Sequence, residues 1–194
     1  MGASLMVFGV DLDALEKVFG SNDRALLTRI EEQYAQELED DEDPHNRVEG
    51  EPTLRQALEE ILANPCSRFK DSFDSQHIRA LRLICGVVGE QYEYDLPDDV
   101  YLSRAGYVLG ERSVADHASF KKLINGPPPL GLPTDEDFPG CGFIGLPGVR
   151  EALARLEPLD VLGLDRWVAF KLIRFHGWLK KADAAGRSLV GFYL

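Results

Sequence analysis

The chain has 194 residues, of which 44% are hydrophobic and 28% are charged, and its formal net charge at pH 7 is −12. This size and composition are typical of one packed globular domain and exclude an intrinsically disordered chain. The acidic balance argues against nucleic acid as a partner, because phosphate binding requires a cationic surface. The uninterrupted apolar runs are far shorter than the roughly 20 residues that a bilayer requires, so we expect no membrane span.

The N-terminus and the cysteines indicate a cytoplasmic protein. Residues 1–15 lack a basic leader and turn acidic at Asp11, which predicts a first strand rather than a secretory signal. The three cysteines form no CxxC pair and have no companion histidine spacing for zinc, which is typical of free thiols in a reducing compartment. The sequence thus gives no signal for a metal or any other cofactor.

The first half of the chain predicts one strand followed by helices. Residues 4–10 form an apolar run that suits a buried strand. Apolar residues then recur at helical spacing, with capping residues before them. We expect a short helix that Asp11 or Asp13 caps and that runs through Val18, a second from Ser21 or Asn22 to Leu38, a third after a capping box of Thr53 and Gln56, and a central one from His77 to Val88 that Asp74 or Ser75 opens.

The second half predicts further helices and a last strand. Residues 92–97 and 100–109 are ambiguous between short strand and irregular structure. A Pro/Gly-rich loop follows at residues 125–148, and a loop of that length is a place to look for function. We also expect a helix over 113–124 with Ser113 as its cap, one from Pro147 through Leu156, one from Asp165 to Ala184, and a strand over 188–194.

Two apolar terminal strands with helices between them favour an α+β fold. We predict a single, predominantly helical domain over residues 1–194, with a small sheet in which the N-terminal and C-terminal strands pair. An acidic loop is expected at residues 39–52, where the charge density cannot support a packed element.

Charge is unevenly distributed along the chain. Residues 31–60 hold twelve acidic and two basic residues, a net charge of −10. Residues 165–194 hold six basic and two acidic residues, a net charge of +4. The molecule should therefore be polar from one end to the other, unless the two regions meet.

Gly140, Gly142 and Gly145 in GCGFIG match the dinucleotide-binding pattern GxGxxG by letter. That pattern cradles a pyrophosphate when a strand precedes it and a helix begins in it. Here the acidic, proline-broken residues 133–139 precede it and would repel phosphate. We interpret the three glycines as a tight structural loop.

Cys141 lies between two glycines, as an exposed nucleophile on a turn would, and a thiolate at neutral pH needs a nearby histidine. His117 and His176 are the available partners. The alternative is a small thiol beneath a loop with two histidines packed at the edge of a core, the commoner fate of these residue types. We favour this structural interpretation and keep Cys141, His117 and His176 as weak catalytic candidates.

The acidic run predicts a docking surface for a basic protein, which long-range charge would steer. Its residues are Glu39, Asp40, Asp41, Glu42 and Asp43. The alternative is a loop that only keeps the protein soluble, since charge runs often have no other purpose.

The last predicted helix carries basic and aromatic residues that could bind an anion. The helix dipole alone favours lysines near its C-terminus, so a ligand is not required to explain them. These residues are Arg166, Trp167, Lys171, Arg174, Trp178, Lys180 and Lys181.

Several stretches resemble a family of bacterial proteins from actinobacteria and myxobacteria that is classed as a domain of unknown function. They are SLMVFGVDLDAL, SNDRALL, EPTLRQALEEIL, DFPGCGFIG and AGRSLVGFYL. The resemblance implies a stand-alone cytoplasmic bacterial protein and supplies no catalytic residues. The strand-first start and the closing AGRSLVGFYL are more loosely similar to small bacterial families that include toxin-neutralising immunity proteins.

Our leading hypothesis is a cytoplasmic, immunity-like or regulatory protein that binds a basic protein through its acidic surface. The alternative is a small-ligand-binding protein or an enzyme whose site lies near the 125–148 loop. Clustering of Cys141, His117 and His176 would favour the alternative, whereas three dispersed side chains and an exposed acidic patch would favour binding.

Overall fold

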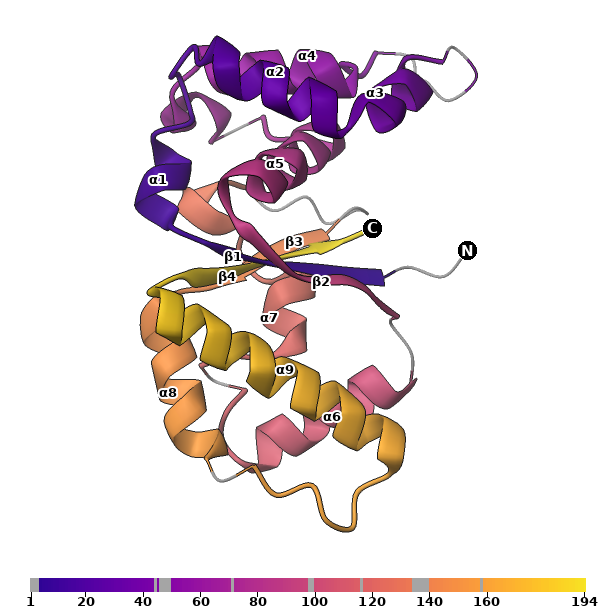
Figure 1. Cartoon of the computed structure of the whole chain (residues 1–194), viewed down its shortest axis with the longest axis vertical. Coiled ribbons are helices and arrows are strands. Elements are labelled where there is room, and N and C mark those ends of the chain that lie inside the picture. The colour runs from indigo at the N-terminus through magenta and orange to yellow at the C-terminus, as the bar shows by residue number, and fades with distance from the viewer. Residues whose placement is uncertain are drawn as a thin grey trace.

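A computed structural model of the chain describes residues 4–43, 45, 50–70, 72–97, 100–115, 117–133, 140–157 and 159–194. A four-stranded antiparallel sheet lies between two layers of helices (Figure 1). The strand order is β2-β1-β4-β3, and the strands are β1 (Ser4–Val10), β2 (Glu90–Pro97), β3 (Gly140–Ile144) and β4 (Ser188–Tyr193). This confirms the predicted α+β fold with paired terminal strands.

The two terminal strands form the centre of the sheet. Leu5 of β1 lies opposite Tyr193 of β4. Side chains alternate along β1, so that Leu5 and Val7 enter the core on one face while Phe8 and Val10 enter the core on the other. Both faces of the sheet are therefore buried.

The first helical layer covers the face to which Phe8 points (Figure 1). Its helices are α1 (Leu12–Glu16), α2 (Arg24–Gln33), α3 (Ala35–Glu42), α4 (Leu54–Ala63) and α5 (Ser75–Val88). The capping box of Thr53 and Gln56 is present at α4, and Asp74 caps α5. The side chains between this layer and the sheet are called the first core.

Two predictions in this layer were wrong. The single helix expected to reach Leu38 is two helices, because the backbone of Tyr34 leaves the helical region and its ring packs where Gly86 of α5 has no side chain. Helix α3 then continues through Glu42, so the first residues of the acidic loop predicted at 39–52 are helical. Of the rest of that loop, residues 44 and 46–49 lie outside the described residues.

The second helical layer covers the opposite face of the sheet (Figure 1). Its helices are α6 (Val100–Glu111), α7 (Phe120–Asn125), α8 (Leu146–Leu156) and α9 (Arg166–Ala185). The helix expected from Ser113 begins only at Phe120 with Ser119 as its cap, because Ser113 adopts a left-handed φ of 55° after α6. The side chains between this layer and the sheet are called the second core.

The glycines of GCGFIG belong to a strand and a helix cap. Gly140 and Gly142 lie in β3, and Gly145 is the N-cap of α8, so a strand interrupts the Pro/Gly-rich loop predicted at 125–148. Gly142 pairs with Gly191 of β4. A methyl group on Gly142 would lie 2.0 Å from the carbonyl oxygen of Lys122, so this glycine pair allows α7 to press directly onto the sheet.

Gly191→Ala is expected to destabilise the protein, because the added carbon would lie 2.5 Å from the carbonyl oxygen of Leu123. Forcing a carbon into a packed interior costs about 1–3 kcal/mol. Gly177→Ala is the control: it lies inside α9, no described atom beyond its two chain neighbours and the adjoining helix backbone lies within 4 Å of an added methyl group, and alanine favours a helix by up to about 1 kcal/mol. Urea denaturation measures both, and a G191A variant as stable as wild type would contradict the close approach of α7.

Candidate functional site

The sheet separates Cys141 from both candidate histidines. Cys141 lies on β3, and its buried side chain belongs to the first core beneath α1–α5. His176 lies on α9 and His117 precedes α7, and both helices cover the opposite face of the sheet (Figure 1). The structure does not bring the thiol together with either imidazole.

The surroundings of these groups set their protonation. Burial raises the pKa of the Cys141 thiol well above its usual value, and nearby Cys85 raises it further. Burial also lowers the pKa of His176, and the positive charge of Lys180 adds to that effect. Near pH 7 the thiol is therefore protonated and His176 is neutral. The third candidate, His117, is partly exposed, with its Nε2 4.0 Å from Oε1 of Glu151.

Of the five acidic residues predicted to bind a partner, Asp41 points inward and is only 8% exposed. One of its carboxylate oxygens accepts a hydrogen bond of 2.7 Å from the backbone N–H of Leu54, at the start of α4. The other accepts hydrogen bonds from Arg79 at 2.5 Å and from Gln76 at 3.3 Å, both on α5. Asp41 therefore joins α3, α4 and α5 and satisfies an orphan donor of a helix N-terminus.

Three further acids form ion pairs within the same layer. Oε1 of Glu42 lies 2.9 Å from Nε of Arg55, whose guanidinium also pairs with Glu31. Glu37 pairs with Arg82, which is buried on α5. Together with Asp41, these pairs fix α3 against its neighbours.

The other three acids, Glu39, Asp40 and Asp43, face solvent and are called the acidic outer face. At 100° per residue, they lie within about 100° of one another around α3, away from buried Leu38. Asp40 accepts a hydrogen bond of 2.9 Å from the side chain of Gln36, and Asp43 accepts one from the backbone of His45. The last turn of α3 holds no basic residue. Three carboxylates thus gather at the negative end of a helix dipole.

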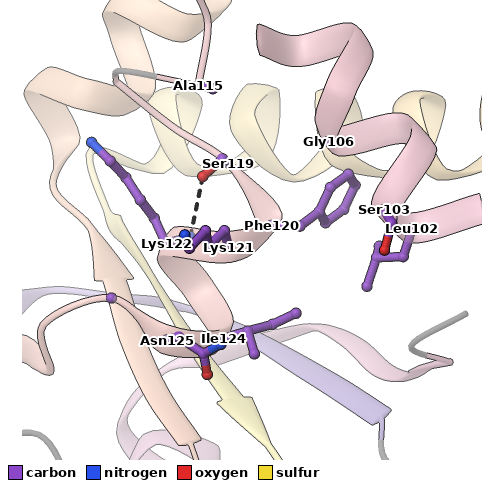
Figure 2. Close-up of a pocket in the computed structure, with 11 residues that line it drawn as sticks. Leu102, Ser103, Gly106, Ala115, Ser119, Phe120, Lys121, Lys122, Ile124 and Asn125 are labelled. Carbon is purple, nitrogen blue, oxygen red and sulfur yellow. Dashed lines mark hydrogen bonds between the residues drawn. The ribbon is translucent and has the colours of Figure 1, made fainter. Parts of the chain in front are cut away.

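A pocket of about 620 Å³ opens between α6 and α7 (Figure 2). Leu102, Phe120 and Ile124 give it an apolar lining, and Phe120 extends from α7 toward α6. Lys121 and Asn125 add polar groups, and the hydroxyl of Ser119 caps α7 by accepting from the backbone N–H of Lys122 at 3.1 Å. The pocket lies where the predicted 125–148 loop begins, but its lining carries no sequence motif that would have revealed it.

The basic and aromatic residues of α9 divide between interior and surface. Lys171 and Trp178 are buried, and Lys180 pairs with Glu157 at 2.9 Å. Arg166 and Trp167 remain exposed at the start of the helix. The seven residues therefore do not form one anion site.

The described part of the chain offers neither a metal site nor a membrane-spanning helix. No group of three or more His, Cys, Asp or Glu side chains there could hold a metal ion. No described helix has the length and apolar character needed to cross a bilayer.

A family model described as a domain of unknown function, DUF7691, matches residues 1–194. The chain belongs to this family. No curated protein and no solved structure matches the chain. Membership of DUF7691 agrees with the resemblance to a domain of unknown function and assigns no site residues, so the function has to be argued from the geometry of the molecule.

Asp41→Asn is expected to lower the free energy of unfolding by about 2 kcal/mol, since it removes the buried charge that accepts from Arg79 and from the N-terminus of α4. Asp40→Asn is the matched control because it removes the same charge from the next residue, and we expect a change within about 0.5 kcal/mol. Urea denaturation compares the two variants. Equal stabilities would show that Asp41 does not hold the three helices together.

Proposed function

We propose that this protein binds a basic protein partner through the acidic outer face of α3, as a cytoplasmic bacterial protein of an immunity-like or regulatory kind. The observation that carries the proposal is the position of Glu39, Asp40 and Asp43. Carboxylates near a helix C-terminus oppose its dipole, and like charges one turn apart repel each other. These acids therefore lower the stability of the unbound protein, which favours a role in binding a partner.

The contacts beneath the acidic outer face support the same proposal. Asp41 and Glu42 bind Arg79 and Arg55, which holds α3 in one orientation while its outer acids stay in solvent. A preorganised charged surface loses little conformational freedom on binding. Its field also accelerates encounter with a cationic partner, and this acceleration falls as salt rises.

The test compares Glu39→Gln/Asp40→Asn/Asp43→Asn with wild type as bait in a pull-down at low and high salt, followed by mass spectrometry and cross-linking. We expect a basic protein that wild type retains at low salt, that cross-links to α3, and that the triple variant loses. The variant should also be more stable than wild type, by about 0.3–0.5 kcal/mol for each charge removed.

The matched control is Glu16→Gln/Glu59→Gln/Glu111→Gln, which changes the net charge equally at exposed positions on other helices. This control should retain the partner. If both triple variants lose it, the protein responds to net charge alone and the assignment to α3 is wrong. If wild type retains no basic protein in a salt-dependent way, the proposal fails.

A second candidate function is the binding of a small molecule in the pocket between α6 and α7. Its volume of about 620 Å³ and its apolar lining support this candidate, because small-molecule sites in proteins have these properties. Lys121 is exposed at the pocket and would favour an anionic group. We therefore expect an apolar carboxylate as the ligand class.

Thermal unfolding with decanoate and with decanol tests the second candidate. We expect decanoate at ten times its dissociation constant to stabilise the protein by about 1.4 kcal/mol, or roughly 3–6 °C in Tm, and decanol to do less. Gly106→Leu should abolish the shift because Gly106 lines the pocket. Gly110→Leu is the control, since Gly110 lies on the same helix outside the lining residues, and a shift that survives in both variants would contradict this site.

A further inference from the structure

Helix α9 has an exposed apolar side in addition to its buried one. Val168, Leu172 and Phe175 pack into the second core. On the other side, Trp167, Phe170 and Ile173 are 45%, 42% and 52% exposed. Three large apolar side chains at a spacing of three residues form one contiguous strip on a helix, and exposed strips of this kind mark interaction sites.

Guanidinium groups cover the aromatic rings of this strip. The guanidinium carbon of Arg166 lies 4.5 Å from the ring centroid of Trp167, and that of Arg174 lies 5.4 Å from the ring of Phe170. Tyr101 of α6 lies 6.3 Å from Trp167, which extends the strip to a second helix. We call Arg166, Trp167, Phe170, Ile173 and Arg174 the aromatic–arginine stripe.

The stripe is cationic on a chain whose net charge is −12. Lys181 lies on the same side of α9 by helical spacing, and Asp183 is the only acidic residue of that helix. Arg174 pairs with Glu93, whereas Arg166 has no ion pair among the described residues. Tryptophan and arginine are the residue types that dominate binding energy at protein interfaces.

We propose that the aromatic–arginine stripe docks an acidic amphipathic helix of a partner protein. The partner's apolar residues would cover Trp167, Phe170 and Ile173, and its carboxylates would pair with Arg166 and Lys181. From Arg166 to Lys181 this side of α9 is about 22 Å long at 1.5 Å per residue, which matches a partner helix of about 15 residues.

Other occupants fit the stripe less well. A membrane or a nucleic acid presents a dense negative surface that the net charge of −12 would repel as a whole, whereas one acidic helix meets the molecule only at its cationic side. A second copy of the chain would offer the acidic outer face, whose Glu39, Asp40 and Asp43 have no apolar side chain to cover Phe170.

This second docking surface is independent of the acidic outer face. Helix α3 belongs to the first layer and α9 to the second, with the sheet between them (Figure 1). The two surfaces attract partners of opposite charge, so each can fail its own test without affecting the other.

The test selects a displayed library of random 16-residue peptides on wild-type protein, after depletion on Phe170→Ala/Ile173→Ala. Both positions are exposed, so we expect the double variant to fold normally, and circular dichroism checks this. We expect enriched peptides to carry a net negative charge with apolar residues at helical spacing. Basic enriched peptides, or no enrichment over the depleted pool, would overturn the proposal.

The affinities of wild type and of substitution variants for the best selected peptide then show where on the protein it binds. Trp167 is exposed and Trp178 is buried, so a blue shift of tryptophan emission on binding reports on the stripe. We expect Phe170→Ala/Ile173→Ala to weaken binding by about tenfold or more. Arg166→Gln/Lys181→Gln should weaken it and reduce its salt dependence, while Leu162→Ala, at a residue that is 89% exposed outside α9, should leave it unchanged.

Two measurements test whether a membrane or a second copy of the chain occupies the stripe instead. Sedimentation of the protein with phosphatidylglycerol vesicles tests a membrane surface, and sedimentation velocity of the protein alone tests self-association. Vesicle binding or self-association that Phe170→Ala/Ile173→Ala abolishes would overturn the assignment to an acidic partner helix. If wild type and the double variant behave alike in both measurements, neither a membrane nor a second copy occupies the stripe, and this result supports the assignment to an acidic partner helix.

Discussion

The pairing of β1 with β4 is the constraint on which the rest of the molecule depends. These strands come from opposite ends of the chain, yet Val10 lies opposite Ser188 and Leu5 opposite Tyr193 in the middle of the sheet. Each strand contributes to the cores on both faces, so each helical layer is complete only when the pair has formed. Loop closure over nearly the whole chain must therefore precede the full gain from burial, which makes the fold rich in long-range contacts.

Helix α3 uses its carboxylates in two ways, and the difference follows from what surrounds each of them. In the first layer, Asp41 is buried with Arg79 and a backbone N–H, where an unpaired carboxylate would be strongly unfavourable. Its sequence neighbour Asp40 points to solvent. The same helix thus carries a buried structural carboxylate and exposed ones. The net charge of the segment does not reveal which carboxylates are buried.

Local signals were sufficient to predict those elements whose ends are fixed by their own residues. The capping box at Thr53, the cap at Asp165 and the left-handed Gly186 gave boundaries close to those observed, as did the apolar terminal strands. Signals failed where a distant segment decides the conformation. The Tyr34 side chain at the helix break packs against Gly86 of α5, and the glycines of β3 allow the close approach of α7. The inward role of Asp41 has a partial signal, because it follows Leu38 by three residues and so shares its face.

The candidate catalytic groups Cys141 and His176 lie too far from each other to react as a pair in this fold. Cys141 is buried on one side of the sheet, and His176, neutral near pH 7, lies on the other, so a thiolate–imidazolium pair would require the sheet itself to be disrupted. The outer surfaces need no such rearrangement, because the acids of α3 and the arginines of α9 already face solvent on helices that the sheet holds apart. A rigid central sheet with both faces covered keeps surfaces of opposite charge from neutralising each other within one molecule. Charge segregation of this kind would be lost if either layer were free to fold across the edge of the sheet, so the central strand pair would matter for both proposed docking surfaces as well as for stability.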